Sequence, residues 1–248
     1  MGWARVESAG RWGLNIQQYR AKKLEQDLRE RARFRPSCGV CFQPQLACYC
    51  SQILAFDPKI KFVILIHPVE ARKRIATGRL SHLVLQDSHL FRGESFGHHL
   101  GVNKILADQS FFPVILYPKG LSLNLSQCDD QVLSHLVPPE KKLVVFVIDG
   151  SWGTANRMIR ESENLSQLPR ICFTPERESR FRVRKQPRQG YLSTVEAIHQ
   201  TIELLGESVG FPLHRRQHDN LIQVFDHLVD QQLALSSQNV SARPTDHK

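Results

Sequence analysis

Short apolar runs alternate along the chain with segments whose apolar positions repeat at helical spacing. Four of these runs predict β-strands, at residues 61–68, 113–118, 141–150 and 168–175. Continuous, β-branched runs of this length are typical of strands that are buried on both faces of a parallel sheet. We therefore expect an α/β fold in which helices flank a mostly parallel sheet.

Helices are predicted around these strands, where helix-forming residues follow one another. The segment 14–35 contains no Gly or Pro and predicts a basic helix that is largely exposed to solvent. The segment 69–85 predicts two helices with a break at Thr77-Gly78, whereas 89–96 is ambiguous between helix and strand. Further helices are expected at 154–161, 193–208 and 219–235.

Polar side chains follow three of the predicted strands at their carboxyl ends. His67 and Glu70 come after the first strand, Asp149 ends the third, and Thr174 ends the fourth. Because the carboxyl ends of parallel strands meet at one edge of a sheet, these residues predict a ligand-binding cleft there. Two structural alternatives stay open: His67 can be a structural histidine, and Asp149 can cap the helix at 154–161.

The stretch after the third strand reads DGSWG and brings a tryptophan to the same edge of the sheet. Trp152 either stacks on a ligand ring or packs as core, and core is the slightly favoured interpretation. The sequence contains no glycine-rich G-x-G-x-x-G turn after a strand and no Walker-type G-x-x-x-x-G-K motif. A dinucleotide-binding domain and a P-loop NTPase are therefore disfavoured.

Four of the six cysteines fall between residues 38 and 50, in the pattern Cys-x2-Cys-x6-Cys-x-Cys. In a reducing compartment such clustering indicates a metal site more often than disulfides. Four thiolates would fill the tetrahedral coordination of a structural zinc ion; an iron–sulfur cluster or a redox pair is the alternative. We expect a zinc knuckle whose ligands are Cys38, Cys41, Cys48 and Cys50. Cys128 and Cys172 stand alone and are interpreted as ordinary thiols.

Charge points to a polyanionic partner. The 248 residues carry a net charge of +9, and residues 1–35 hold nine Lys and Arg against four acids. A second cluster, 170–188, holds seven against two. Nucleic acid is the expected partner of such clusters, and an ordinary solvated surface is the alternative. Since no stretch approaches a membrane span and the first residues lack a secretory pattern, we expect a cytoplasmic protein.

These patterns divide the chain into four regions. They are a basic N-terminal helical extension at 1–35, the zinc knuckle at 36–56, an α/β domain at 57–235 and a polar tail at 236–248. The tail is expected to be disordered because its composition offers little apolar surface to bury.

Four motifs in this order resemble the DTW-domain family of tRNA-uridine aminocarboxypropyltransferases. They are the cysteine pattern, HPVEARKRIATGRL, DGSWGTAN and FRVRKQPRQGYLSTVEA, and the resemblance spans about residues 35–205. Ser151 stands where the family's signature has Thr. Because both residues carry a hydroxyl, we expect the role of this position to be kept.

The resemblance implies a fold and a reaction. The fold would be SPOUT-like and knotted, and it would bind S-adenosylmethionine through backbone loops instead of a glycine-rich turn. The reaction would transfer the 3-amino-3-carboxypropyl group of S-adenosylmethionine to N3 of a uridine in tRNA, with release of 5′-methylthioadenosine. A uridine in a tRNA loop is the expected target, because the base must leave its stack to react.

The resemblance also suggests roles for the residues. The N3–H of uridine must lose its proton, and we expect Asp149 to accept it, with Ser151 and Trp152 in the same catalytic group. Residues expected to contact the cofactor are Asp149, His67, Glu70, Thr77, Thr174, Arg182, Arg184, Ser193, Thr194 and Glu196. Of these, the two arginines can instead bind phosphate, and Ser193, Thr194 and Glu196 can simply cap a helix. The expected tRNA contacts are Arg31, Arg33, Arg35, Arg72, Lys73, Arg74 and Lys185.

Two other functions remain open on sequence alone. A SPOUT-like RNA methyltransferase would use the same cofactor but release S-adenosylhomocysteine. A non-catalytic zinc-containing RNA-binding protein would account for the charge and the cysteines, but it would leave Asp149, His67 and the segment 193–197 without a role. The oligomeric state is open, with a monomer favoured.

Overall fold

The protein is built on one six-stranded parallel sheet with the strand order β2-β1-β5-β3-β6-β4. The computed structural model describes residues 16–33, 36–183 and 191–241, including their side chains except at 28–33 and 236–241. The strands are β1 Lys61–Ile66, β2 Ser88–Arg92, β3 Phe111–Leu116, β4 Leu123–Asn124, β5 Lys142–Asp149 and β6 Arg170–Cys172. All strand pairs are parallel, which confirms the predicted α/β fold.

The four predicted strands form the interior of this sheet, and the two strands that sequence did not predict form its edges. Interior strands are covered on both faces, so their sequences are continuous apolar runs. The edge strand β2 pairs with one neighbouring strand only and is partly exposed, so its sequence mixes polar with apolar residues. For this reason the sequence did not distinguish a strand from a helix there. The other edge strand, β4, has only two residues and leaves no periodic pattern.

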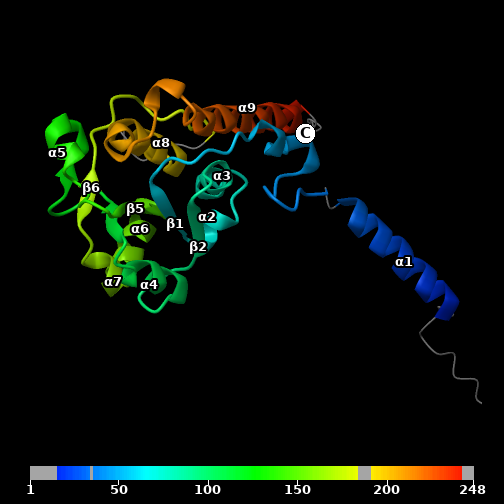
Figure 1. The fold of residues 1–248 in the computed structure, drawn as a ribbon. Helices are drawn as coiled ribbons and strands as arrows, with labels where there is room; N and C mark the ends of the chain where they lie inside the picture. The colour runs from blue at the N-terminus through cyan, green and yellow to red at the C-terminus, as the bar shows by residue number, and fades with distance from the viewer. Residues whose placement is uncertain (1–15, 34–35, 184–190, 242–248) are drawn as a thin grey trace, which may run out of the picture.

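Helices cover both faces of the sheet (Figure 1). The helices are α1 Ile16–Arg33, α2 Pro68–Ala71, α3 Thr77–Val84, α4 Leu100–Ala107, α5 Asp130–Ser134, α6 Trp152–Arg160, α7 Glu163–Ser166, α8 Thr194–Leu205 and α9 Asp219–Ser241. Figure 1 shows α1 projecting away from the body of the molecule, and the described side chains of α1 are exposed, as its basic sequence predicts.

Alternate residues of the central strands face opposite helical layers. In β1 and β5, Phe62, Ile64 and Val145 belong to a core shared with α3, α8 and α9. Their neighbours Val63 and Phe146 belong to a second core shared with α4, α6 and α7. Burial of both faces fixes the register of these strands, since a slip of one residue would exchange the two cores. The carboxyl end of β5 is thereby held at a defined point of the sheet edge.

Two predicted boundaries were wrong. The break in 69–85 does not fall at Thr77-Gly78; residues 72–76 separate α2 from α3, and both predicted breakers lie in the first turn of α3. Glycine is tolerated in a first helical turn where another group approaches the backbone closely. At the other end, α9 continues to Ser241 instead of ending at 235. No Gly or Pro interrupts the chain between Asp219 and Ser241, so the helix can propagate.

The segment 36–56, which holds the four clustered cysteines, packs against the α/β domain. The side-chain amide of Asn220 at the start of α9 accepts a hydrogen bond from Leu54 N and donates one to Gln52 O. Phe56 N donates to Val84 O at the end of α3. Among the described residues, no helix combines the length and the apolar character that crossing a bilayer requires.

Candidate functional site

Asp149 lies where the ends of two strands and the starts of two helices meet. It is the last residue of β5 and is only 6% exposed. Its Oδ2 accepts a hydrogen bond of 2.9 Å from Gly78 N in the first turn of α3, and its Oδ1 accepts one of 2.8 Å from Thr194 Oγ1 at the start of α8. Its backbone oxygen accepts from His67 N, beyond the end of β1. One residue therefore joins the ends of two strands to the starts of two helices.

Gly78 is required by this arrangement. A Cβ atom at this position would lie 2.4 Å from Asp149 Oδ2 and 3.0 Å from Ile64 Cγ2. Both neighbours are buried and belong to the sheet, so neither can move away cheaply. The glycine lets the start of α3 approach the carboxylate closely enough for its N–H to donate, so the positive end of the helix dipole lies beside this side chain.

The helix after β5 is capped by Ser151, not by Asp149. Ser151 precedes the first residue of α6, and its Oγ accepts a hydrogen bond from Thr154 N at 3.3 Å. This excludes the alternative in which Asp149 serves as the cap. Since the shorter serine side chain satisfies the helix, the carboxylate is directed to α3 and α8 instead.

An aromatic-walled cavity opens beside this point, at the carboxyl ends of β3, β5 and β6. Its volume is about 250 Å³. The rings of Trp152 and Tyr191 lie 4.8 Å apart between centroids, and those of Trp152 and Tyr117 lie 5.8 Å apart. Trp152 is 39% exposed, so the prediction that it packs as core was wrong. The ring forms part of the cavity wall, where it can stack on a planar or cationic ligand.

The rest of the cavity wall is mainly apolar. Within the described part of the chain, Thr194 is the one predicted cofactor residue that lines the cavity. Gly150 and Trp152 of the DGSWG stretch also line it. Thr194 thus faces the cavity while its hydroxyl donates to Asp149. The lining residues are Leu116, Tyr117, Pro118, Val147, Ile148, Gly150, Trp152, Ala155, Cys172, Phe173, Pro175, Tyr191, Leu192, Thr194 and Ala197.

Glu196 and Ser193 make the capping arrangement that sequence left open. Glu196 Oε2 accepts from Ser193 N at 2.8 Å, and the pair forms a capping box at the start of α8. Glu196 also accepts hydrogen bonds from Arg180 N and from Ser179 Oγ. Glu196 therefore connects the segment that contains Ser179 and Arg180 to the start of α8, and it helps to fix the position of Thr194.

The predicted residues that follow β1 and β6 do not line the cavity. His67 caps α2 through its Nδ1, which accepts from Val69 N at 3.3 Å. Glu70 is buried and pairs with Lys73 at 2.5 Å, and Thr77 is the buried first residue of α3. Thr174 Oγ1 accepts from the side chain of Asn124, while the neighbours of Thr174 in the chain line the cavity.

The four clustered cysteines are brought together as a compact thiol group. Their sulfur atoms all lie within 4.8 Å of one another, and Cys38–Cys50 and Cys41–Cys48 are each 3.7 Å apart. A tetrahedral zinc ion with Zn–S bonds of about 2.3 Å requires sulfur–sulfur distances of about 3.8 Å. Backbone N–H groups of Cys41 and Val40 lower the pKa of Cys38 to about 6, whereas burial raises the pKa of Cys41 and of Cys50. Without a cation, therefore, the cluster favours a thiolate only at Cys38; a bound metal would stabilise the others. None of the six cysteines forms a disulfide in the described structure.

Part of the predicted basic surface lies beside this cysteine group. The side chain of Gln43 donates a hydrogen bond to Arg74 O, and the Arg79 guanidinium lies 4.6 Å from the centre of the Phe42 ring. Arg72 and Arg74 are exposed. The loop between α2 and α3 is thus fastened to the cysteine segment, and its arginines face solvent next to it.

The other predicted cations are placed only in part. Arg182 pairs with Asp230 on α9, and its side chain is 57% exposed. Arg31 and Arg33 belong to α1, but their side chains lie outside the described ones, as do residues Arg35, Arg184 and Lys185 altogether.

A family model, described as the DTW domain, matches residues 35–233, which include the cysteine group, the Asp149 junction and the cavity. The chain belongs to the DTW domain family. This confirms the resemblance inferred from the sequence motifs.

Several curated proteins resemble this DTW domain, and three of them carry the name tRNA-uridine aminocarboxypropyltransferase 2. The one from Drosophila melanogaster is 27% identical over 179 residues, which cover 69% of this chain and 67% of that protein. The one from Macaca fascicularis is 26% identical over 180 residues, covering 71% and 58%. The one from Mus musculus is 26% identical over 206 residues, covering 79% and 61%. The matches thus span 58–67% of the relatives' lengths, and no solved structure matches the chain significantly.

The residues that sequence reasoning missed in the DTW domain are those whose role depends on distant partners. Tyr117 follows β3 directly, and an aromatic residue at a strand end was a signal that could have been used. Tyr191 follows no strand and meets Trp152 only in the folded chain. Gly78 was interpreted as a helix breaker, although its role is to admit the Asp149 carboxylate.

Proposed function

We propose that this protein transfers the 3-amino-3-carboxypropyl group of S-adenosylmethionine to N3 of a uridine in tRNA. The observation that carries the proposal is the coupling of an aromatic cavity to a buried carboxylate through Thr194, in a DTW domain whose relatives are named for this reaction. We further propose that the domain at 57–235 is SPOUT-like and knotted, and that the protein acts as a monomer in the cytoplasm.

The residues of the cavity suit the proposed cofactor. Trp152, Tyr117 and Tyr191 offer ring faces for the adenine and for the positive charge of the sulfonium. S-adenosylmethionine, when bound, supplies the electrophilic carbon and a good leaving group. The task left to the protein is alignment of that carbon with N3 of the base and exclusion of water, which the apolar wall provides.

A proton path connects the cavity to Asp149. We propose that N3–H of uridine gives its proton to Thr194 Oγ1 while the hydroxyl proton of Thr194 passes to Asp149 Oδ1, 2.8 Å away. Gly78 N continues to donate to Oδ2 and holds the carboxylate in place. In this scheme Asp149 is the final proton acceptor, as its sequence position suggested, and Thr194 is the group that touches the substrate.

The remaining cations are assigned to tRNA. Arg72 and Arg74 lie beside the cysteine segment, and Arg182 is exposed with only a surface ion pair, which contributes little stability. We propose that they bind phosphates, together with Lys73, Arg31, Arg33, Arg35 and Lys185. Arg184 and the predicted residues His67, Glu70, Thr77 and Thr174 are proposed to contact or to position the cofactor. Zinc held by the four cysteines would keep the knuckle rigid against α9 and the α2–α3 loop.

The reaction is tested by incubating the protein with S-adenosylmethionine and unmodified tRNA and analysing the products by mass spectrometry. Methylthioadenosine and a uridine heavier by one aminocarboxypropyl group are expected. S-adenosylhomocysteine with a methylated nucleoside would establish the methyltransferase alternative. Absence of both products, with tRNA binding retained on several tRNAs, would establish the binding-only alternative.

The proton path is tested with Thr194→Val, which removes the hydroxyl at nearly constant shape. The turnover number should fall at least about a hundredfold, because proton transfer by a positioned group contributes about 10²–10⁴-fold. Thr194→Ser should keep most of the activity. The matched control is Thr201→Val on the same helix, whose hydroxyl donates to the backbone oxygen of Ala197 and which is not itself among the lining residues of the cavity. A Thr194→Val enzyme with normal turnover would overturn the path.

A further inference from the structure

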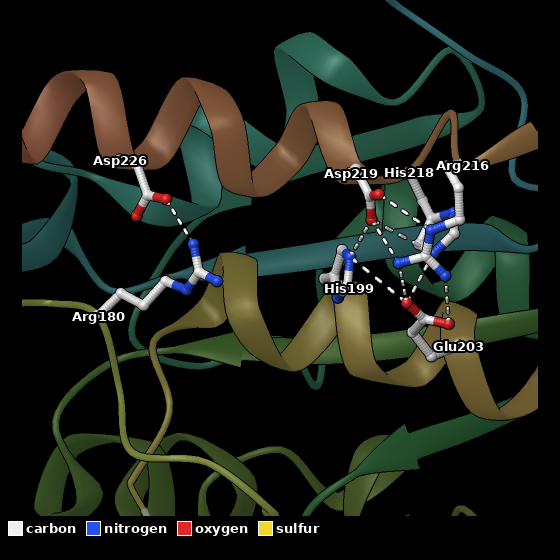
Figure 2. A network of polar contacts seen from close by, with 7 residues as sticks. All are labelled: Arg180, His199, Glu203, Arg216, His218, Asp219 and Asp226. Carbon is white, nitrogen blue, oxygen red and sulfur yellow. Dashed lines mark hydrogen bonds and ion pairs between the residues drawn. The ribbon is translucent and has the colours of Figure 1, made fainter.

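A second group of metal-binding side chains lies between α8 and α9, apart from the cysteines. His199 and Glu203 stand one turn apart on α8, while His218 and Asp219 come from the start of α9 (Figure 2). One ligand atom from each of the four residues lies within 4.8 Å of the others. Neither the proposed transfer reaction nor the knuckle uses these side chains.

The distances within this His–Glu–His–Asp group fit one metal ion. His199 Nε2 is hydrogen-bonded to Asp219 Oδ1 at 3.0 Å and lies 3.8 Å from Glu203 Oε1. His218 Nε2 lies 3.0 Å from Glu203 Oε1 and 3.8 Å from Asp219 Oδ1. Tetrahedral zinc with bonds of about 2.0–2.2 Å needs ligand atoms roughly 3.3–3.5 Å apart. The four distances straddle that value, so small movements would complete the coordination.

His218 provides an independent indication. The side chain is completely buried, and within the described residues neither of its ring nitrogens has a hydrogen-bond partner. Its Nε2 nevertheless lies 3.0 Å from Glu203 Oε1. The two atoms are therefore close without being aligned as a hydrogen bond, so the imidazole nitrogen can still bind a metal ion. A buried imidazole without such a partner is costly, and a metal ion would satisfy it.

The chemical types of the four side chains also suit a cation. The carboxylates of Glu203 and Asp219 carry together the charge that balances one divalent ion, and imidazole nitrogens are common metal ligands.

The Arg216 guanidinium would compete with a metal ion for the carboxylates of Glu203 and Asp219. Its Nη2 lies 2.6 Å from Glu203 Oε1 and 2.7 Å from Asp219 Oδ1, the same oxygen atoms that would bind the ion. The side chain of Arg216 is half exposed and extends from a short surface turn, so it can swing into solvent. Figure 2 shows the guanidinium between the two carboxylates.

We propose that His199, Glu203, His218 and Asp219 form a second, structural metal site for a divalent transition-metal ion, which binds by displacing the Arg216 guanidinium. Two imidazoles and two carboxylates suit zinc among the common ions. The ion would fasten α9 to α8, the helix whose first residue donates to Asp149. The site therefore stabilises the helix pair without taking part in the reaction.

The proposal is tested by titrating the full chain with Zn²⁺ and measuring bound metal and thermal stability. The wild-type protein should bind one equivalent of Zn²⁺ more than the double variant His199→Asn/His218→Asn. This difference should be the same whether or not the four clustered cysteines hold zinc. Loss of either histidine alone should lower the affinity more than about a hundredfold, since loss of an outer partner already costs about 10–100-fold. His199→Asn serves if the buried His218 cannot be replaced without unfolding.

Arg216→Gln makes the decisive comparison, because it removes the competing charge and should raise the affinity for Zn²⁺ about tenfold or more. Arg180→Gln is the matched control. It removes the 2.6 Å ion pair between Arg180, which precedes α8, and Asp226 on α9, but it leaves the four proposed ligands intact. Its affinity should equal that of wild type. If neither wild type nor Arg216→Gln binds the additional equivalent, or if that equivalent persists in the double variant, the proposal is wrong. This readout does not depend on transferase activity.

Discussion

The Thr194 hydroxyl donates a hydrogen bond of 2.8 Å to Asp149 Oδ1 and so connects the start of α8 to the end of β5. The other carboxylate oxygen accepts from Gly78 N, at the start of α3. Three segments that lie far apart in the sequence therefore share one buried carboxylate. Thr194 lines the cavity, whereas Gly78 does not. A substitution at Gly78 therefore tests how the junction is packed, and a substitution at Thr194 tests the chemistry beside the cavity.

Replacing Gly78 with Ala should destabilise the protein and reduce its activity. The added Cβ would approach Asp149 Oδ2 to 2.4 Å, and overpacking of this kind costs about 1–3 kcal/mol. The melting temperature should fall by about 2–4 °C for each kcal/mol, as measured by calorimetry. Gly153→Ala is the control, because a Cβ there meets no atom within 4 Å and lies in α6. If both variants melt alike, the close approach at Gly78 does not matter for stability.

Replacing Trp152 with Ala should weaken cofactor binding while leaving the fold intact. A stacked aromatic pair contributes about 0.5–1.5 kcal/mol to the binding free energy, so without the ring the dissociation constant for S-adenosylmethionine should rise up to about tenfold. The ring is 39% exposed, so the free energy of unfolding should change little. Titration calorimetry and thermal melts measure the two effects. Trp152→Phe should recover most of the affinity, and Leu100→Ala, at an exposed position outside the cavity, should leave it unchanged.

Replacing Cys41 with Ser should remove one equivalent of zinc and loosen the knuckle. Cys41 is completely buried, and its sulfur lies 3.7 Å from that of Cys48. Amide hydrogen exchange should accelerate within residues 36–56 but not within the central strands, because the knuckle has little core of its own. Affinity for tRNA should fall. Cys128→Ser, outside the cluster, is the control, and unchanged zinc content in the Cys41 variant would contradict the assignment.

Asp87 should make stability depend on pH in the acid range. Burial alone would raise the pKa of Asp87, but the ammonium groups of Lys142, at 2.5 Å, and Lys61 lower it. An acid with a lowered folded pKa stabilises the protein above its unfolded pKa of about 3.9 and loses that contribution as the pH falls through the folded value. Asp87→Asn should therefore cost about 1 kcal/mol at pH 7, and the difference from wild type should shrink as the pH falls below the unfolded pKa of about 3.9 and through the lower folded value.

Urea melts of both proteins at pH 7, 5, 4 and 3 measure this dependence. Asp27→Asn is the control, because it removes the same charge from the exposed helix α1. The free energy of unfolding of Asp27→Asn should equal that of wild type at all four pH values. A difference for Asp87→Asn that stays constant down to pH 3 would show that the contribution does not come from ionisation of the carboxylate.

Prediction from sequence succeeded where the physical signal was local. The interior strands were predicted because burial on two faces demands uninterrupted apolar runs, and the cysteine cluster was predicted because its four thiols lie within a few residues of one another in the sequence. Prediction failed at β2 and β4, whose edge positions impose no such pattern. It also failed for Trp152, because a tryptophan in a loop packs or remains exposed according to neighbours such as Tyr191, which are distant in the sequence.

The sequence by itself determined the α/β class, the interior strands, the basic helix α1, the cysteine cluster and the family, since each of these depends on composition, periodicity or short spacing. Only the tertiary structure decided that Asp149 binds α3 and α8 while Ser151 caps α6, and that four side chains of α8 and α9 converge within reach of one metal ion. These relationships join residues far apart along the chain. They are fixed by the stacking of helices on the sheet, which local patterns do not encode.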